Sequence, residues 1–127
     1  RIEATAEQLS RQSDAGAQSM AAHLRSATAD FLRSVDYLCA HAGAQPNAVY
    51  AGSVPFLMLA GNLLAGWQMG RSWLAADGLP AEQSAFALQK KITSVFYAQH
   101  LLPRCHAQAL TIAQGADSCL ALSAQDF

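Results

Sequence analysis

A long stretch without formal charge limits what this chain can fold into. No Asp, Glu, Lys or Arg occurs between Asp36 and Arg71, and about 20 predominantly apolar residues are enough to cross a membrane. This stretch, however, contains Pro55, Asn62 and, from Gly52 to Gly70, four glycines, and it lacks a basic flank on one side. We therefore expect a buried central helix rather than a membrane span.

The segment from about Asn47 to Ala76 is apolar on two sides, which predicts a helix that packs against two neighbours or lies at a subunit interface. Pro55 should open this helix or kink its first turns. Gly66 and Gly70, four residues apart, should let another backbone approach closely. One stripe consists of Phe56, Ala60, Leu63, Trp67, Gly70 and Leu74, and the other of Leu59, Asn62, Gly66, Met69 and Trp73.

Two further long helices are predicted from apolar residues at helical period. The first spans Ala17–Ala42 and should end at Gly43 in a left-handed cap. The second spans Ala81–Ala113, with a kink at Pro103 because proline cannot donate a hydrogen bond to the preceding turn. The first stripe contains Met20, Leu24, Ala27, Phe31, Val35, Leu38 and Ala42, and the second contains Leu88, Ile92, Val95, Gln99, Leu102, His106, Ala109 and Ala113.

The fold class predicted from these segments is all-α. Ile2, Ala6 and Leu9 indicate a short N-terminal helix before the three long ones. With brief connecting loops, the four helices should form an up-down bundle. The composition agrees, since 27 alanines against 11 Val, Ile and Thr residues favour helix over sheet.

Length and charge narrow the function classes. The 127 residues predict a single domain, residues 1–127. Because 52% of the residues are hydrophobic and 13% charged, the chain should not be disordered. A formal net charge of −1 gives no basic footprint for nucleic acid or an anionic membrane.

The first residues and the cysteines indicate what kind of protein the chain comes from and in which cellular compartment it folds. The chain opens at Arg1 with no initiator Met and no apolar leader, so we expect a piece of a longer or processed protein. Cys39, Cys105 and Cys119 are odd in number and irregularly spaced, which does not make a disulfide framework. A reducing cytoplasm is the simplest location.

Common catalytic motifs are missing from the sequence. There is no glycine-rich phosphate loop, and the segment 51–55 lacks the second glycine of a nucleophile elbow. The only glutamates are Glu3, Glu7 and Glu82, all near segment starts, where a general base in an apolar pocket is hard to build. We expect Asp30 and Asp36 to lie on a solvent-exposed face.

Histidines and cysteines are the remaining candidates for chemistry. Cys105 and His106 lie five and six residues after His100, whereas metal ligands on one helix need a spacing of three or four residues. We therefore predict no metal site there, nor at Cys39 and His41. His106 should be a packed histidine with one hydrogen-bonded nitrogen, and Cys105 a small buried thiol rather than a nucleophile.

Aromatic residues offer either a core or a ligand pocket. Trp67 and Trp73, with Phe86, Phe96 and Tyr97, could line a groove for an acyl chain or the edge of a cofactor. At helical spacing they are more typical of a core, so we expect both tryptophans to serve the core or an interface rather than catalysis. If Trp67 is fully buried, Trp67→Ala should cost ~3–5 kcal/mol. No catalytic, cofactor-binding or metal-binding residue is predicted.

Two stretches carry a resemblance to a known family. Residues 54–61 (VPFLMLAG) with 65–71 (AGWQMGR), and residues 96–103 (FYAQHLLP) with 115–122 (GADSCLAL), are similar in order and spacing to the extra C-terminal domain of many bacterial acyl-CoA dehydrogenases. The similarity covers nearly the whole chain and is weakest over the first fifteen residues. Residues 115–127 resemble the natural end of such a protein.

The resemblance implies a larger parent enzyme. That parent would be an FAD flavoprotein of fatty acid metabolism that oxidises an acyl-CoA thioester to its 2,3-enoyl form and passes electrons to an electron-transfer flavoprotein. Its flavin-binding motifs and catalytic glutamate belong to the domains before this one, and no position here matches them. The implied role is non-catalytic: assembly with the preceding domains or a second subunit, or covering of the core.

Two other readings stay open. The chain could be an independent helical module that holds an apolar ligand between its helices. It could also be a dimerisation bundle of an unrelated protein.

Overall fold

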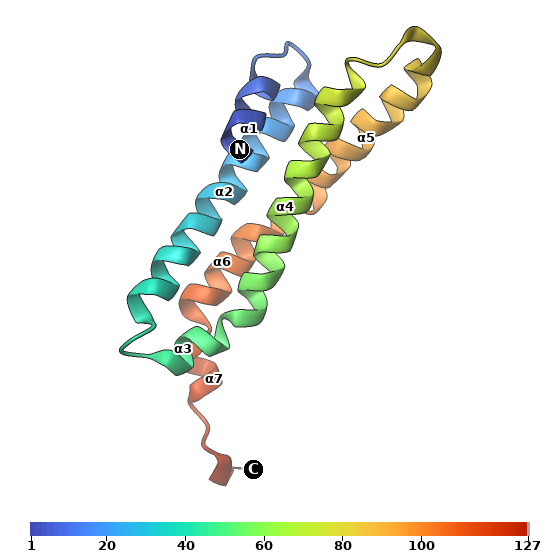
Figure 1. The fold of residues 1–127 in the computed structure, drawn as a ribbon. Helices are drawn as coiled ribbons and strands as arrows, with labels where there is room; N and C mark the ends of the chain where they lie inside the picture. The colour runs from blue at the N-terminus through green and yellow to red at the C-terminus, as the bar shows by residue number, and fades with distance from the viewer. Residues whose placement is uncertain (127) are drawn as a thin grey trace.

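A computed structural model describes residues 1–126 and shows an elongated bundle of α-helices (Figure 1). The two longest helices, α2 (Ala15–His41) and α4 (Ser53–Ala76), run antiparallel along its length. The third long member consists of α5 (Ser84–His100) followed by α6 (Arg104–Gln114). Described residues contain helices, turns and bends but no strand, so the all-α class is confirmed.

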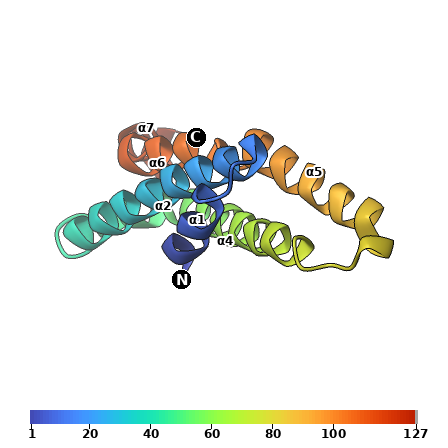
Figure 2. The ribbon, with the colours of Figure 1, turned by 90° about the horizontal axis from the view of Figure 1, so that it is seen from above.

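Short elements complete the bundle at its two ends. Helix α1 (Ile2–Ser10) folds back on α2 and α4, as the view from above shows (Figure 2). At the opposite end, α3 (Pro46–Ala51) packs on α7 (Ala116–Leu120). Two 3-10 turns, η1 (Ala81–Gln83) and η2 (Ala124–Asp126), precede α5 and follow α7.

Local chemistry sets the helix boundaries. Asp14 caps α2 because its Oδ1 accepts hydrogen bonds from the backbone N–H groups of Gly16 (2.7 Å) and Ala17 (3.3 Å). Pro55 lies in the first turn of α4, where its missing N–H costs little. The expected left-handed cap at Gly43 is wrong, since no described glycine has a positive φ. Instead Ala42, the residue after α2, keeps right-handed helical angles (φ −56°, ψ −37°), and Gln45 N–H donates to the His41 carbonyl (2.8 Å).

The kink expected at Pro103 is a complete break between α5 and α6. The N–H groups of Leu101 and Leu102 both donate to the Tyr97 carbonyl, at 2.9 and 3.2 Å. Proline has no N–H to continue the ladder, and it also disfavours helical backbone at the residue before it. The turn directs the Leu102 side chain into the core, where it is 2% exposed.

The core combines the predicted stripes of α1, α2 and α4, but not that of α5. Ala6, Leu9, Met20, Leu24, Leu59 and Leu63 are all buried. Leu88 and Ile92, by contrast, are 59% and 60% exposed, so the predicted stripe is wrong at these two positions, although Val95 does pack against the core. Helix α5 packs instead through Ser94 and Ala98, both fully buried. These small side chains bring it close to α4, and Ser94 Oγ donates to the Met69 carbonyl at 3.0 Å.

The charge-free stretch holds the central helix, as expected. Both stripes of α4 are buried or half-buried. Gly66 and Gly70 do allow close packing, but side chains rather than another backbone use the space: Leu102 faces Gly66, and Leu24 and Leu9 face Gly70. Within residues 1–126, no helix is long and apolar enough to cross a membrane.

Candidate functional site

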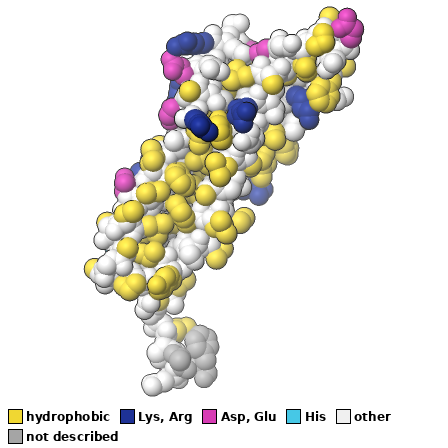
Figure 3. Space-filling model, viewed as in Figure 1, with side chains coloured by type: hydrophobic (Ala, Val, Ile, Leu, Met, Phe, Trp, Pro, Cys, Tyr) yellow, Lys and Arg dark blue, Asp and Glu magenta, His cyan; other side chains and the backbone are white. Residues whose placement is uncertain are grey.

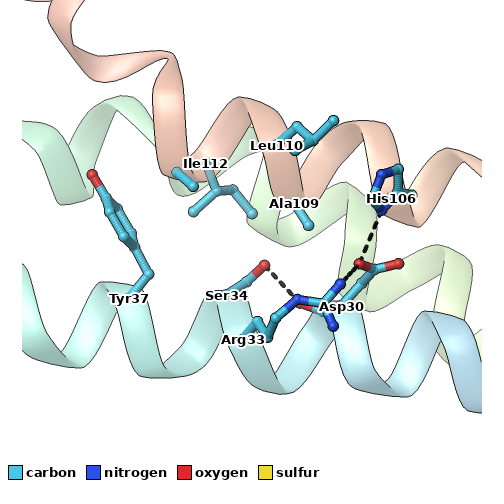
Figure 4. Close-up of a pocket in the computed structure, with 9 residues that line it drawn as sticks. Asp30, Arg33, Ser34, Tyr37, His106, Ala109, Leu110 and Ile112 are labelled. Carbon is cyan, nitrogen blue, oxygen red and sulfur yellow. Dashed lines mark hydrogen bonds and ion pairs between the residues drawn. The ribbon is translucent and has the colours of Figure 1, made fainter.

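A buried carboxylate between α2 and α6 is the most polar feature of the interior (Figure 4). Asp30 on α2 is 1% exposed, so the expected solvent-exposed position is wrong. Its Oδ1 lies 3.2 Å from Nδ1 of His106 on α6 and also pairs with the Arg33 guanidinium. Asp30 turns inward because α6 packs directly over this face of α2, which the spacing of charges along α2 does not reveal. The carboxylate therefore ties two helices that are distant in sequence.

The partners of Asp30 lie at the surface. The side chains of His106 and Arg33 are each 64% exposed. The packed position expected for His106 is therefore wrong, although one of its nitrogens does have a polar partner. Because α6 places His106 at the edge of its contact with α2, the imidazole reaches Asp30 from outside. A buried carboxylate with two such partners suits a structural tie, since its charge is paired.

The neighbouring thiol is chemically quiet. Cys105 is fully buried, as predicted, and its Sγ lies 3.9 Å from the Leu59 carbonyl. Burial, together with the negative charge of Asp30, raises the pKa of Cys105 to about 11. A thiol with so high a pKa is protonated near neutral pH and is a poor nucleophile.

The pocket beside Asp30 is small and mostly apolar. It has a volume of about 140 Å³ and is lined by Tyr37, Ala109, Leu110 and Ile112 besides the polar residues. An Asp–His pair can orient a base, but it then needs a nucleophile within reach of the imidazole. Ser34 carries the pocket hydroxyl that is nearest to Asp30 in the sequence. Its Oγ donates a hydrogen bond to the Asp30 backbone carbonyl at 2.9 Å. The arrangement therefore supports a helix–helix tie rather than a catalytic triad.

Other candidate residues are dispersed. Glu3, Glu7 and Glu82 are all exposed, and Glu7 pairs with Arg11 one turn away. Among residues 1–126, no three His, Cys, Asp or Glu side chains gather as metal ligands would. All three cysteines are free.

Two larger hollows lie at the surface between helices. The α2–α4 groove, about 320 Å³, is bounded by Ile2, Thr28, Phe31, Leu32, Ala60 and Leu64, with Arg1 and Glu3 at its edge. The α5 groove, about 370 Å³, lies over Trp73, Leu88, Ile92, Val95 and Phe96. Apolar spacing alone predicted most of these residues to be part of the core. Only the folded chain shows that several of them remain exposed at the two grooves.

The tryptophans occupy different environments. Trp73 is 2% exposed, and its Nε1–H donates to Gln12 Oε1 at 2.8 Å. Trp67 is half-buried against the core, and its Nε1–H donates to Thr5 Oγ1 at 2.9 Å. Both indole N–H groups thus connect α4 to the N-terminal part of the chain.

Comparison with known proteins assigns the family. A family model described as "Acetyl-CoA dehydrogenase C-terminal like" matches residues 1–123. The chain belongs to this family of C-terminal domains. The chain is also 47% identical, over 124 residues, to a 3-methylmercaptopropionyl-CoA dehydrogenase of Ruegeria pomeroyi. That alignment covers 96% of this chain but only 21% of the relative, and it confirms the resemblance seen in the sequence.

Acyl-CoA dehydrogenases are FAD-dependent enzymes, but the residues of this domain do not fit a flavin dinucleotide. Its two phosphates require free N–H groups or cations, often at a glycine-rich turn. In the α5 groove, Lys91 is the one Lys or Arg side chain in the lining, and it already pairs with Asp77. The α2–α4 groove is lined mainly by apolar side chains, and its one cationic side chain, Arg1, shares the lining with the carboxylate of Glu3. We therefore derive no catalytic step through this domain.

Proposed function

We propose that this domain is the non-catalytic C-terminal part of an FAD-dependent acyl-CoA dehydrogenase. The observation that carries the proposal is the match over nearly the whole chain to a domain that forms only 21% of a relative with that activity. The parent reaction would be α,β-dehydrogenation of an acyl-CoA thioester. Flavin and catalytic base would then belong to the preceding domains, with an electron-transfer flavoprotein as electron acceptor.

The domain itself would serve assembly. Its exposed glutamates and dispersed polar groups support no role in proton abstraction. Large apolar side chains remain exposed on α4, among them Leu57 and Leu64, as on a surface that another protein surface covers. Three free cysteines are in keeping with a reducing cytoplasm.

The test uses the complete reading frame that contains this chain. We would purify the protein, record its visible absorption spectrum, and add acyl-CoA thioesters of several chain lengths together with 3-methylmercaptopropionyl-CoA. A flavin spectrum that bleaches with at least one thioester is expected. A protein without flavin, or a flavin indifferent to every thioester, would refute the parent activity and favour an independent binding or dimerisation module.

A second set of variants tests the non-catalytic role. Glu3→Gln, Glu7→Gln and Glu82→Gln remove every glutamate of this domain in turn. The flavin of each variant should bleach at the rate of the unmodified enzyme, because all three side chains are exposed and Glu3, which lines the α2–α4 groove, lies there among mainly apolar side chains. Loss of bleaching in one variant that still binds flavin and melts normally would place the catalytic base in this domain and contradict the proposal.

A further inference from the structure

One face of the bundle exposes apolar side chains around the α2–α4 groove. On α4, Leu64 lines the groove and is 52% exposed. Leu57, 71% exposed, is not part of the lining but lies two turns earlier on the same face of the helix, with Gly61 between the two leucines. Leu32 on α2 is 56% exposed and lies at the edge of the same groove. In Figure 3, apolar side chains gather over the lower parts of α2 and α4, whereas charged ones gather toward the other end.

This α2–α4 face can be covered without desolvating a charge on α4 before Arg71. The segment 37–70, which includes α3 and most of α4, contains no Asp, Glu, Lys or Arg. The exposed face of α5 differs, because Lys90 and Lys91 lie over the rings of Phe86 and Trp73 at 5.0 and 5.2 Å. Burial of an ammonium group carries a desolvation cost. The two faces are therefore unequal: apart from Glu3 of α1 and Arg1 just before it, the lining of the α2–α4 groove carries no charge, so this face is better suited to an apolar protein surface.

The position of residue 1 indicates what covers this face. Arg1, Ile2 and Glu3 lie along the α2–α4 groove. In the proposed parent enzyme, the preceding domains, about four fifths of the length in the relative, join the bundle at Arg1. The polypeptide before Arg1 thus starts at the edge of the groove. A tethered segment binds with a high effective concentration, which a second copy of the chain does not have.

We propose that an uncharged, apolar segment of the preceding domains in the same polypeptide docks in the α2–α4 groove and covers Leu57 and Leu64. This inference rests on the proposed function and adds to it the docking face and its occupant. The face of α5 is the matched comparison, since Leu88 is similarly exposed (59%) in a helix of the same bundle.

The experiment is photo-crosslinking in the full-length enzyme. We would introduce the photoreactive residue p-benzoylphenylalanine in place of Leu57, and separately in place of Leu88 as the control. After irradiation, denaturing electrophoresis separates links within one chain from links between chains, and peptide mass spectrometry locates the partner. The Leu57 variant should give a product of monomer mass, linked to an uncharged apolar peptide upstream of Arg1. The Leu88 variant should give at most about a tenth of that yield.

Each other result overturns the proposal. A product of doubled mass from the Leu57 variant would show that another subunit covers this face. The absence of a product, or equal upstream links from both variants, would show that the groove is not the docking face.

A charge introduced at the same positions gives an independent measurement. Leu57→Asp would bury an unpaired carboxylate in the docked state and so weaken docking. A protease that cleaves ahead of Arg1 releases a fragment of 13.4 kDa. In this variant the cleavage should become at least about tenfold faster. Leu88→Asp should leave that rate unchanged, and equal rates in the two variants would refute the docking. The flavin spectrum of each preparation tests the proposed function separately, because a crosslinked but flavin-free protein would refute only the parent activity.

Discussion

Close packing at Gly66 makes a quantitative prediction for α4. A methyl group at this position would lie 2.5 Å from Cδ2 of Leu102 and 3.1 Å from its Cγ and Cδ1. Leu102 is 2% exposed and held by the turn before Pro103, so it has little room to move. Overpacking of this kind costs about 1–3 kcal/mol. The gain in helix propensity from Gly to Ala is about 1 kcal/mol, so Gly66→Ala should be neutral to destabilising by roughly 2 kcal/mol.

Gly61 provides the matched control on the same helix. A methyl group there would meet no atom within 4 Å, so Gly61→Ala should stabilise the 127-residue chain by about 1 kcal/mol. Both substitutions share the propensity gain. The difference between their free energies of unfolding, about 1–3 kcal/mol, therefore isolates the contact with Leu102.

Urea denaturation followed by circular dichroism measures both free energies. In a Leu102→Ala background, the penalty at Gly66 should disappear, and Gly66→Ala should then stabilise the chain as Gly61→Ala does. The reasoning is refuted if Gly66→Ala is as stable as Gly61→Ala when Leu102 is intact, or if the penalty persists after Leu102 is truncated.

Three further predictions follow from burial and charge. Trp73→Ala should lower the free energy of unfolding in urea by about 3–5 kcal/mol, more than Trp67→Ala because Trp67 is only half-buried; equal losses would contradict this. With its pKa near 11, Cys105 should resist iodoacetamide in the native chain and react only in urea, and prompt labelling seen by mass spectrometry would show that it is accessible. The hydrogen bond from Lys91 holds the pKa of Asp77 below its usual 3.8, so Asp77 stabilises the fold above that pH and the effect is lost as pH falls through the lowered pKa. Thermal unfolding should therefore show a deficit for Asp77→Asn at pH 6 that shrinks below pH 3.8, and a deficit independent of pH would refute the ion pair.

The helices themselves could be predicted from the sequence because their signals are local. Apolar spacing located α2, α4 and the short α1, and Pro103 located the break between α5 and α6. Such features depend on a few neighbouring residues and on the steric limits of the backbone. The family could also be recognised, since its two motifs are contiguous stretches of sequence.

Positions that depend on a neighbouring helix could not be predicted in this way. The sequence neighbours of Asp30 on α2 are typical of an exposed helix face, yet the packing of α6 against α2 buries its side chain. Leu88 and Ile92 have the spacing of core residues, yet they remain exposed because Ser94 and Ala98 bring α5 closer to α4 by their smaller side chains.

The sequence by itself determined that this chain forms long helices, that the central one is apolar on more than one side, and that the chain is related to the C-terminal domains of acyl-CoA dehydrogenases. The tertiary structure alone decided which apolar residues form the core and which remain exposed. Periodicity shows that a helix has an apolar face, but the size of the side chains at each contact selects the face that packs. The exposed faces of α4 and α5 follow from that selection.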